Sequence, residues 1–196
     1  MIGAVILSAG ESSRMGRPKA LLPIGGQTFI EKIVGTLNAT PVGKIIVVLG
    51  HNAVDLRQRI EHLPVEILVN PDYQLGQLSS LQVAVRRLQA ENDCDGMLVH
   101  LVDHPYIERS LVDEMVRRFY ESKKFIVVPS CGGKRGHPVI FSRALFGELL
   151  GAPMDQGAKA VVNAHREDTL EIATDYEGIP VDIDTPEIYK KHVQGE

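Results

Sequence analysis

The amino-acid sequence predicts an α/β fold with a mostly parallel, doubly wound sheet, built by a single domain over residues 1–196. Short, continuous apolar runs are typical of strands that are buried on both faces of a parallel sheet. Stretches with the apolar spacing of amphipathic helices separate these runs, as βαβ units require. A chain of 196 residues suffices for one well-packed domain, and we find no repeat or linker that would divide it.

Five apolar runs define the strands expected in the first two thirds of the chain: 2–7, 45–49, 65–69, 97–102 and 125–128. The first expected helix follows Thr28, which has the capping-box spacing to Glu31. Further helical patterns cover 54–60, 79–88 and 110–120.

The last third is less regular. It contains a glycine-rich turn at 132–136, expected strands at 138–141 and 170–173, helical stretches at 144–150 and 157–165, and a final helix opened by Pro186.

Composition excludes several classes of protein. Acidic residues outnumber basic ones by 25 to 21, a balance opposite to that of a general nucleic-acid binder. No apolar run approaches the roughly 20 residues of a membrane span, and the N-terminus lacks the features of a signal peptide. Cys94 and Cys131 form no CxxC pair, which argues against a disulfide framework or a zinc site. We therefore expect a cytoplasmic protein without nucleic-acid or membrane partners.

The most informative segment is the loop 7–19, LSAGESSRMGRPK, which follows the first expected strand. Ligands of doubly wound sheets bind at the carboxyl ends of strands. Ala9 and Gly10 leave the backbone accessible, and Arg14, Arg17 and Lys19 supply three cations suited to a polyphosphate. The spacings of a P-loop and of a GxGxxG dinucleotide site are absent. The alternative interpretation is a solvated surface loop with incidental charges.

This segment resembles the L-x-A-G-x-S-x-R-M-G-x-x-K signature of the molybdenum-cofactor nucleotidyltransferases, and within them the cytidylyltransferase branch. Through later motifs the resemblance extends over essentially the whole chain. It implies a Rossmann-like nucleotidyltransferase fold and Mg²⁺-dependent transfer of CMP from CTP to the phosphate of molybdenum-bound molybdopterin, with release of pyrophosphate. A molybdoenzyme that receives the cofactor is the implied protein partner. Arg14 and Lys19 are the implied catalytic cations, and the implied nucleotide-binding residues of this segment are Leu7, Ser8, Ala9, Gly10, Arg14, Gly16 and Lys19.

Two aspartates are the expected metal ligands. Asp103 follows the fourth apolar run, where a carboxylate can reach a metal that bridges triphosphate oxygens. By spacing alone, an Asp that ends the strand or caps the next helix is equally compatible. The family's D-x-P motif, with His104 where Met is usual, implies roles for Asp103 in metal binding, nucleotide binding and catalysis. Asp184 stands in a D-I-D-T-P segment like the family's second metal-binding motif, and capping of the helix at Pro186 is its alternative role.

Two further segments are assigned through the resemblance. Gly76, Ser79 and Ser80 match a stretch beside the nucleotide's base and ribose, although Ser79 is also a plausible helix N-cap. Arg135 and His137 match an R-G-H-P-V element on the acceptor side, for which a charged hairpin is the alternative.

Other functions remain compatible with these residues. They are guanylyl transfer to the same cofactor, nucleotidyl transfer to a sugar, polyol or terpenoid phosphate, and a nucleotide-binding cofactor chaperone without turnover. The Ala9 methyl narrows the space beside the base, which favours CTP over GTP.

Overall fold

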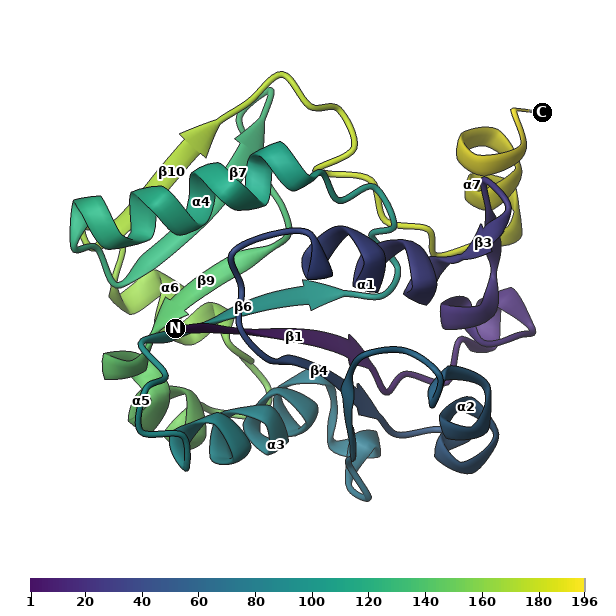
Figure 1. The fold of residues 1–196 in the computed structure, drawn as a ribbon, viewed down its shortest axis with the longest axis horizontal. Coiled ribbons are helices and arrows are strands. Elements are labelled where there is room, and N and C mark those ends of the chain that lie inside the picture. Colours follow the sequence, from purple (N-terminus) through teal and green to yellow (C-terminus); the bar gives the residue numbers. More distant parts are fainter. Residues whose placement is uncertain (196) are drawn as a thin grey trace.

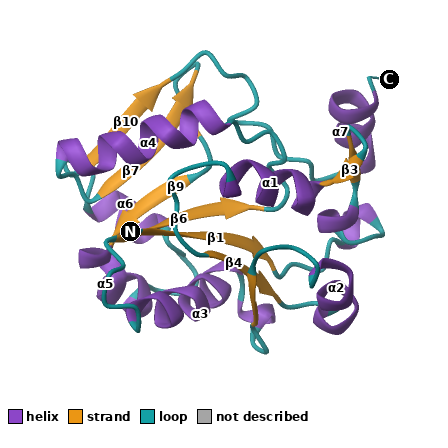
Figure 2. Cartoon of the chain, viewed as in Figure 1, coloured by secondary structure: helices purple, strands orange, loops and turns teal. Residues whose placement is uncertain are grey.

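The computed structural model describes residues 1–195, which form an α/β fold around one twisted eight-stranded sheet (Figures 1 and 2). The strand order is β10-β7-β9-β6-β1-β4-β5, with β8 beside β7. Only β9 and β8 run antiparallel to their neighbours. The strands of this sheet are β1 (Ile2–Ser8), β4 (Ile45–Leu49), β5 (Glu66–Val69), β6 (Gly96–Leu101), β7 (Ile126–Cys131), β8 (Lys134–Arg135), β9 (Val139–Ser142) and β10 (Thr169–Ala173). A separate hairpin pairs β2 (Pro23–Ile24) with β3 (Gln27–Thr28).

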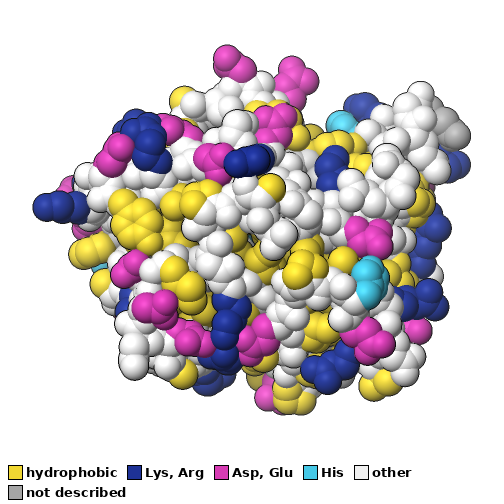
Figure 3. Space-filling view, in the orientation of Figure 1, with side chains coloured by type: hydrophobic (Ala, Val, Ile, Leu, Met, Phe, Trp, Pro, Cys, Tyr) yellow, Lys and Arg dark blue, Asp and Glu magenta, His cyan; other side chains and the backbone are white. Residues whose placement is uncertain are grey.

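Helices cover both faces of the sheet (Figure 1). They are α1 (Phe29–Asn38), α2 (Ala53–Ile60), α3 (Gln77–Gln89), α4 (Arg109–Ser122), α5 (Phe146–Gly151), α6 (Lys159–Ala164) and α7 (Pro186–Tyr189), the last continued by a π-helical turn over Lys190–Gln194. Helices α1 and α4 lie on one face, and α3 and α5 lie on the other. On the face seen in Figure 3, acidic and basic side chains are interspersed.

Successive side chains of β1 point to opposite faces of the sheet, and both sets are apolar because helices cover both faces. Ile2, Ala4 and Ile6 pack with α1 and α4, whereas Val5 and Leu7 pack with α3 and α5. All seven residues of β1 are buried, so the central strand cannot show a polar face.

A third apolar cluster joins the two ends of the chain. Met15 and Leu22 of the N-terminal region pack against Ile183 and Tyr189 near the C-terminus. The Tyr189 hydroxyl donates a hydrogen bond to the Pro23 carbonyl (2.6 Å), and its ring lies beside that of Phe29. Figure 1 shows the result: α7 stands beside β3 rather than against the main sheet.

The structure confirms the predicted fold class, and the five apolar runs are strands. Thr28 caps α1, and its reciprocal hydrogen bonds with Glu31 complete the capping box. One boundary was wrong: α3 begins at Gln77 with Gly76 as N-cap, so Ser79 lies inside the first turn and is not the cap. Within residues 1–195, no helix combines the length and apolarity that crossing a bilayer requires.

Candidate active site

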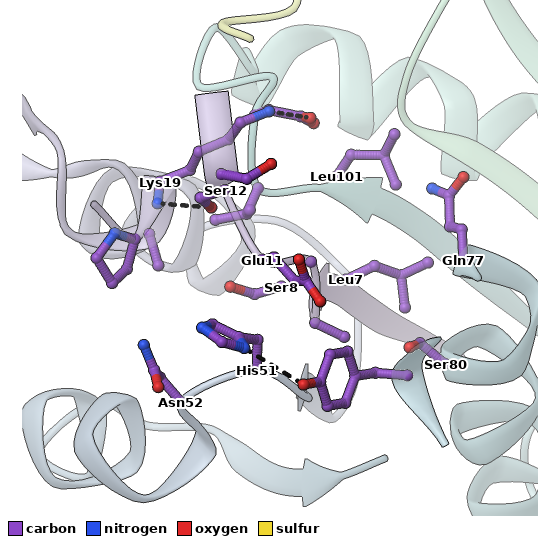
Figure 4. Close-up of a pocket in the computed structure, with 18 of the residues that line it drawn as sticks. Leu7, Ser8, Glu11, Ser12, Lys19, His51, Asn52, Gln77, Ser80 and Leu101 are labelled. Carbon is purple, nitrogen blue, oxygen red and sulfur yellow. Dashed lines mark hydrogen bonds and ion pairs between the residues drawn. The ribbon is translucent and has the colours of Figure 1, made fainter. Parts of the chain in front are cut away.

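The candidate site lies at the edge of the sheet where the parallel strands β1, β4 and β6 end. Beyond β1 lies the loop that starts at Ala9, beyond β4 lie His51 and Asn52, and beyond β6 lies Asp103. These segments surround a cavity of about 360 Å³, shown in Figure 4, which we call the first cavity. Its size falls within the range of small-molecule sites.

Close backbone approach fixes the wall between these loops. The His51 N–H donates to the Ala9 carbonyl at 3.1 Å. A Cβ at Gly50 would lie 2.7 Å from that same carbonyl oxygen and 2.5 Å from the Tyr73 side chain. Only glycine fits this position. Because Gly50 has no side chain, Tyr73 and Ala9 can approach each other closely, and both line the cavity.

The loop after β1 folds back through a single 3-10 turn, Ser13–Met15. Ser12 and Gly16 flank the turn with left-handed backbones, at φ 52° and 67°. Met15 is buried, and the Lys19 N–H donates to the Ser12 hydroxyl at 3.3 Å. Anchored in this way, the loop brings Arg14 and Lys19 to the same side of the cavity.

Lys19 lies between two carboxylates. Its ammonium contacts Asp103 Oδ2 at 3.0 Å and also pairs with Asp184 Oδ1. Arg14 donates to the other oxygen of Asp184 at 2.5 Å. Only 12% of the Lys19 side chain is exposed, against 66% for Arg14, so the lysine is the enclosed member of the group. We call these four residues the charge cluster.

A backbone hydrogen bond positions the second carboxylate. The Ile183 N–H donates to the Asp103 carbonyl at 2.8 Å, and the Ile183 side chain is fully buried in the third apolar cluster. Thr185, the next residue after Asp184, caps α7. The capping role considered for Asp184 therefore belongs to Thr185, which leaves the Asp184 carboxylate to the two cations.

Within the charge cluster, the pKa values of Lys19 and Asp184 are both shifted toward the charged form. Burial opposes the charged form of Lys19, but hydrogen bonds and attraction from Asp184 and Asp103 outweigh it and raise the pKa of the lysine. Burial likewise opposes the charged form of Asp184, yet Lys19 and Arg14 lower the pKa of that carboxyl below its usual value.

A second cavity of about 830 Å³ adjoins the first, since Leu7 and Gln77 line both. Three cationic side chains, two imidazoles and two carboxylates line it among apolar residues: Lys134, Arg135, Lys159, His104, His137, Asp155 and Asp182. Asp103 faces the first cavity while its neighbour His104 faces the second. The charge cluster therefore lines the first cavity, and the second cavity begins at chain neighbours of its aspartates, His104 and Asp182.

Three histidines pack together at the second cavity, which two of them, His104 and His137, line. The rings of His104 and His137 are 5.2 Å apart, and His100 lies 6.4 Å from each of them. Burial lowers the pKa of His100 to about 3 and that of His137 to about 4, and it also lowers the pKa of His104. All three rings are neutral at pH 7, so His104 and His137, which line the second cavity, add polar surface to it without adding charge.

Comparison with known proteins decides the family, because residues 4–169 match the MobA-like NTP transferase domain. The chain belongs to this family. It is 29% identical to the molybdenum cofactor cytidylyltransferase of Escherichia coli K12, over 95% of this chain and 92% of that protein. It is 31% identical to the nicotine blue oxidoreductase of Paenarthrobacter nicotinovorans, over 74% of this chain and 72% of that protein. The chain spans only 26% of the length of another relative, the bifunctional IPC transferase and DIPP synthase of Rubrobacter xylanophilus.

Solved structures agree with the nucleotidyltransferase fold. Rv0371c from Mycobacterium tuberculosis H37Rv superimposes with a TM-score of 0.87 at 28% identity, over 98% of this chain and 97% of that one. A structure of the same mycobacterial protein in complex with manganese gives a TM-score of 0.83 at 27% identity, over 100% and 99% of the two chains.

The structure brings most of the sequence-predicted residues of this family member together. Nine of the expected nucleotide-binding residues and the second expected metal ligand line the first cavity: Leu7, Ser8, Ala9, Gly10, Arg14, Lys19, Gly76, Ser80, Asp103 and Asp184. Arg135 and His137, expected on the acceptor side, line the second. Arg135 also pairs with Glu171 at 2.7 Å.

Three residues lie elsewhere. Gly16 is outside the cavity lining, where its N–H closes the 3-10 turn onto Ser12 and Ser13. Ser79 is also outside the lining; its hydroxyl donates to the carbonyls of Asp72 and Gly76. Arg17, counted among the cations of the loop, lies over the Tyr189 ring at 5.7 Å and away from the cavity.

Sequence reasoning missed part of the first cavity, namely His51, Asn52, Tyr73 and Gln77. His51 and Asn52 directly follow a strand that was correctly identified, so the rule that ligands bind at strand ends could have found them. Tyr73 carries no such signal, because it lies in a short 3-10 helix, Tyr73–Leu75, and reaches the cavity through its close approach to Gly50.

The charge cluster fits a hard divalent cation only in part. Asp103 Oδ1 is buried and accepts no hydrogen bond from any residue in 1–195. The carboxylates of Asp103 and Asp184 converge on Lys19, and oxygen ligands suit Mg²⁺ or Mn²⁺. Across the described part of the chain, however, no three His, Cys, Asp or Glu side chains are grouped to hold a metal. Phosphate and water oxygens would have to complete the coordination, as is usual for Mg²⁺.

The buried histidines predict an acid-sensitive fold. A histidine whose folded-state pKa is depressed stays neutral, whereas in the unfolded chain it takes up a proton below pH about 6.5. Stability is therefore lost as pH falls from about 6.5 toward the folded value, and His100 alone accounts for on the order of 2 kcal/mol between pH 7 and pH 5. His100→Gln keeps a donor for the His104 carbonyl, which His100 Nε2 contacts at 2.8 Å, but cannot titrate.

Urea unfolding at pH 7 and pH 5 measures this difference. The loss of unfolding free energy on acidification should be smaller in His100→Gln by on the order of 2 kcal/mol. The surface variant His62→Gln, whose parent side chain is 60% exposed, is the matched control. Equal acid sensitivity in wild type and His100→Gln would contradict the assignment.

Proposed function

We propose that this family member transfers CMP from CTP, in preference to GMP from GTP, to the phosphate of molybdenum-bound molybdopterin with release of pyrophosphate. The observation that supports a two-substrate transferase best is that the cavity lined by the charge cluster adjoins a second cavity, which is lined by the chain neighbours His104 and Asp182 of the two aspartates. One cavity takes the nucleotide and the other takes the acceptor, and the reacting phosphorus lies between them.

The triphosphate binds along the loop after β1. Gly10 is exposed, and a Cβ there would meet no protein atom within 4 Å, so the backbone is open to phosphate oxygens. Arg14 grips these oxygens with its planar fork and Lys19 with its ammonium. Base and ribose occupy the part of the cavity lined by Ala9, Tyr73 and Ser80.

The proposed transfer requires only that the protein position the two phosphates and stabilise negative charge. An oxygen of the acceptor phosphate attacks the α-phosphorus, the bond from that phosphorus to the β-phosphate oxygen breaks, and pyrophosphate leaves with the electron pair. The acceptor phosphate is already ionised near neutral pH, so neither a protein nucleophile nor a strong base is required. Arg14 and Lys19 stabilise the charge that develops on the leaving group.

Asp103 and Asp184 are the residues that would hold Mg²⁺ with the triphosphate oxygens. The mycobacterial structure with manganese, a related chain, supports a divalent cation. Such an ion supplies electrostatic stabilisation of the charge on the transferred and leaving phosphates.

The acceptor lies in the second cavity. Its basic side chains, Lys134, Arg135 and Lys159, suit an anionic ligand, and its apolar walls suit a flat ring system such as a pterin. A molybdoenzyme that receives the finished dinucleotide cofactor is the partner implied by this product.

The decisive experiment measures Mg²⁺-dependent pyrophosphate release with each nucleoside triphosphate against a panel of phosphorylated acceptors. Release that requires molybdopterin supports the proposal, release with a sugar, polyol or terpenoid phosphate assigns another acceptor, and binding without release indicates a chaperone.

Asp103→Asn should lower kcat by at least roughly a hundredfold while preserving the fold, because it removes a charged ligand without changing side-chain shape. Asp55→Asn is the control, since Asp55 is a surface residue of α2 paired only with Arg59 in the described chain. Near-normal turnover of folded Asp103→Asn at saturating Mg²⁺ would refute the metal role.

Lys19→Ala and Arg14→Ala should weaken CTP binding by roughly tenfold or more and CMP binding much less, since a charge-assisted phosphate contact contributes about 1.5–3 kcal/mol. Calorimetric titration with both nucleotides measures the effect. Arg17→Ala is the matched control from the same loop, because Arg17 lies outside the cavity. Equal losses for CTP and CMP would place the two cations away from the β- and γ-phosphates.

Ala9→Gly should shift kcat/KM toward GTP. Ala9 is 8% exposed as a residue and lines the first cavity, and we propose that its methyl occupies space that a purine needs. A single methyl discriminates by about 1–3 kcal/mol, and the expected change in the CTP to GTP ratio is roughly tenfold or more. An unchanged ratio would remove the steric explanation, and better use of GTP by the native protein would overturn the CTP preference itself.

A further inference from the structure

We propose that Asn70 fixes the hydrogen-bonding polarity of Ser80, so that Ser80 offers a donor to the nucleobase and selects a base edge made of acceptors. Asn70 acts as a positioning residue and does not itself reach the first cavity. The inference rests on the proposed binding of a nucleoside triphosphate in that cavity. It goes further by identifying the side chain that distinguishes one nucleobase from another.

The orientation of the Asn70 amide is determined by its partners. Asn70 follows β5 and is 2% exposed. The backbone N–H of Asp72 donates to Asn70 Oδ1 at 3.0 Å. A backbone N–H can only donate, so this bond identifies the amide oxygen and directs Nδ2 to the opposite side.

The amide nitrogen in turn determines the roles of two hydroxyls. Nδ2 lies 2.8 Å from the Ser79 hydroxyl and 2.9 Å from the Ser80 hydroxyl. The amide nitrogen carries two protons and accepts none, so both hydroxyls must accept from it. Each serine is left with its own proton to donate elsewhere.

The two serines use that proton differently. The single proton of Ser79 is shared between the Asp72 carbonyl at 3.0 Å and the Gly76 carbonyl at 2.7 Å. For Ser80, no group in residues 1–195 is hydrogen-bonded as its acceptor. Ser80 lines the first cavity, and Figure 4 shows it beside Gln77 at the start of α3. Its hydroxyl proton therefore remains for a ligand.

A fixed donor at this wall distinguishes base edges. Cytosine presents two neighbouring acceptors, O2 and N3, whereas the corresponding edge of guanine presents the donors N1–H and the 2-amino group. The Ser80 hydroxyl cannot reverse its role without losing the Asn70 hydrogen bond, and leaving buried polar groups unpaired is costly. The Asn70–Ser80 pair thus favours cytosine independently of the space beside Ala9.

Asn70→Asp tests the polarity with almost no change of shape. The Asp72 N–H still donates to one carboxylate oxygen, and the other oxygen now accepts the serine protons, which leaves a Ser80 lone pair toward the base. Binding of CTP and GTP, measured by calorimetry without acceptor, should show the CTP to GTP affinity ratio reduced roughly tenfold. Ser80→Ala should reduce the same ratio, and Asn70→Asp should change it no further in the Ser80→Ala background.

Ser79→Ala is the matched control, because Ser79 shares the Asn70 contact but does not line the cavity. It should lower the melting temperature and leave the ratio unchanged. If Asn70→Asp does not fold, the comparison of Ser80→Ala with Ser79→Ala carries the test. Equal losses for CTP and GTP in Asn70→Asp, or equal ratios in the two serine variants, overturn the inference. A native protein that binds no nucleoside triphosphate refutes the proposed function as well.

Discussion

Parallel pairing of β1 with β4 on one side and β6 on the other is the constraint on which the site depends. Parallel neighbours place their carboxyl ends at one edge, so the loops after three strands must meet there. Because β1 is buried on both faces, its register is held by apolar contacts of two cores. The cavity is consequently built on the buried centre of the sheet, while its charged side chains come from the loops.

The charge cluster combines this strand-end geometry with the third apolar cluster. Arg14 and Lys19 come from the first loop, Asp103 from the end of β6, and Asp184 from the C-terminal segment. Two cations face two carboxylates, which balances charge in a partly buried place where an unpaired ion would be costly. The same pairing places Lys19 where a metal shared by the carboxylates and the triphosphate would lie. A cation held by both carboxylates, as proposed above, would displace the Lys19 ammonium from them, and the triphosphate oxygens would then be its new partners.

Apolar runs predicted the central strands well, because a strand that is buried on both faces of the sheet needs an apolar residue at nearly every position. The loop after β1 and Asp103 were also predictable, since glycine, cations and a carboxylate follow such runs directly. Asn70 was not, because its importance lies in hydrogen bonds to α3 that no local pattern encodes. The start of α3 was misplaced since Ser79 has the composition of an N-cap, yet its hydroxyl bonds the Gly76 carbonyl within the first turn.

The distance along the chain between Lys19 and Asp184 has a consequence for biosynthesis. The ribosome releases the chain from its N-terminus, and the two partners of this ion pair are separated by 165 positions. Pairing of β1, β4 and β6 involves no residue beyond Leu101, so the central sheet can form while the C-terminal segment is still being synthesised. Until Ile183 docks on the Asp103 carbonyl, a nascent chain has the fold but only one of its two carboxylates in place. The charge cluster is thus completed only after the central sheet has all of its strands β1, β4 and β6 available.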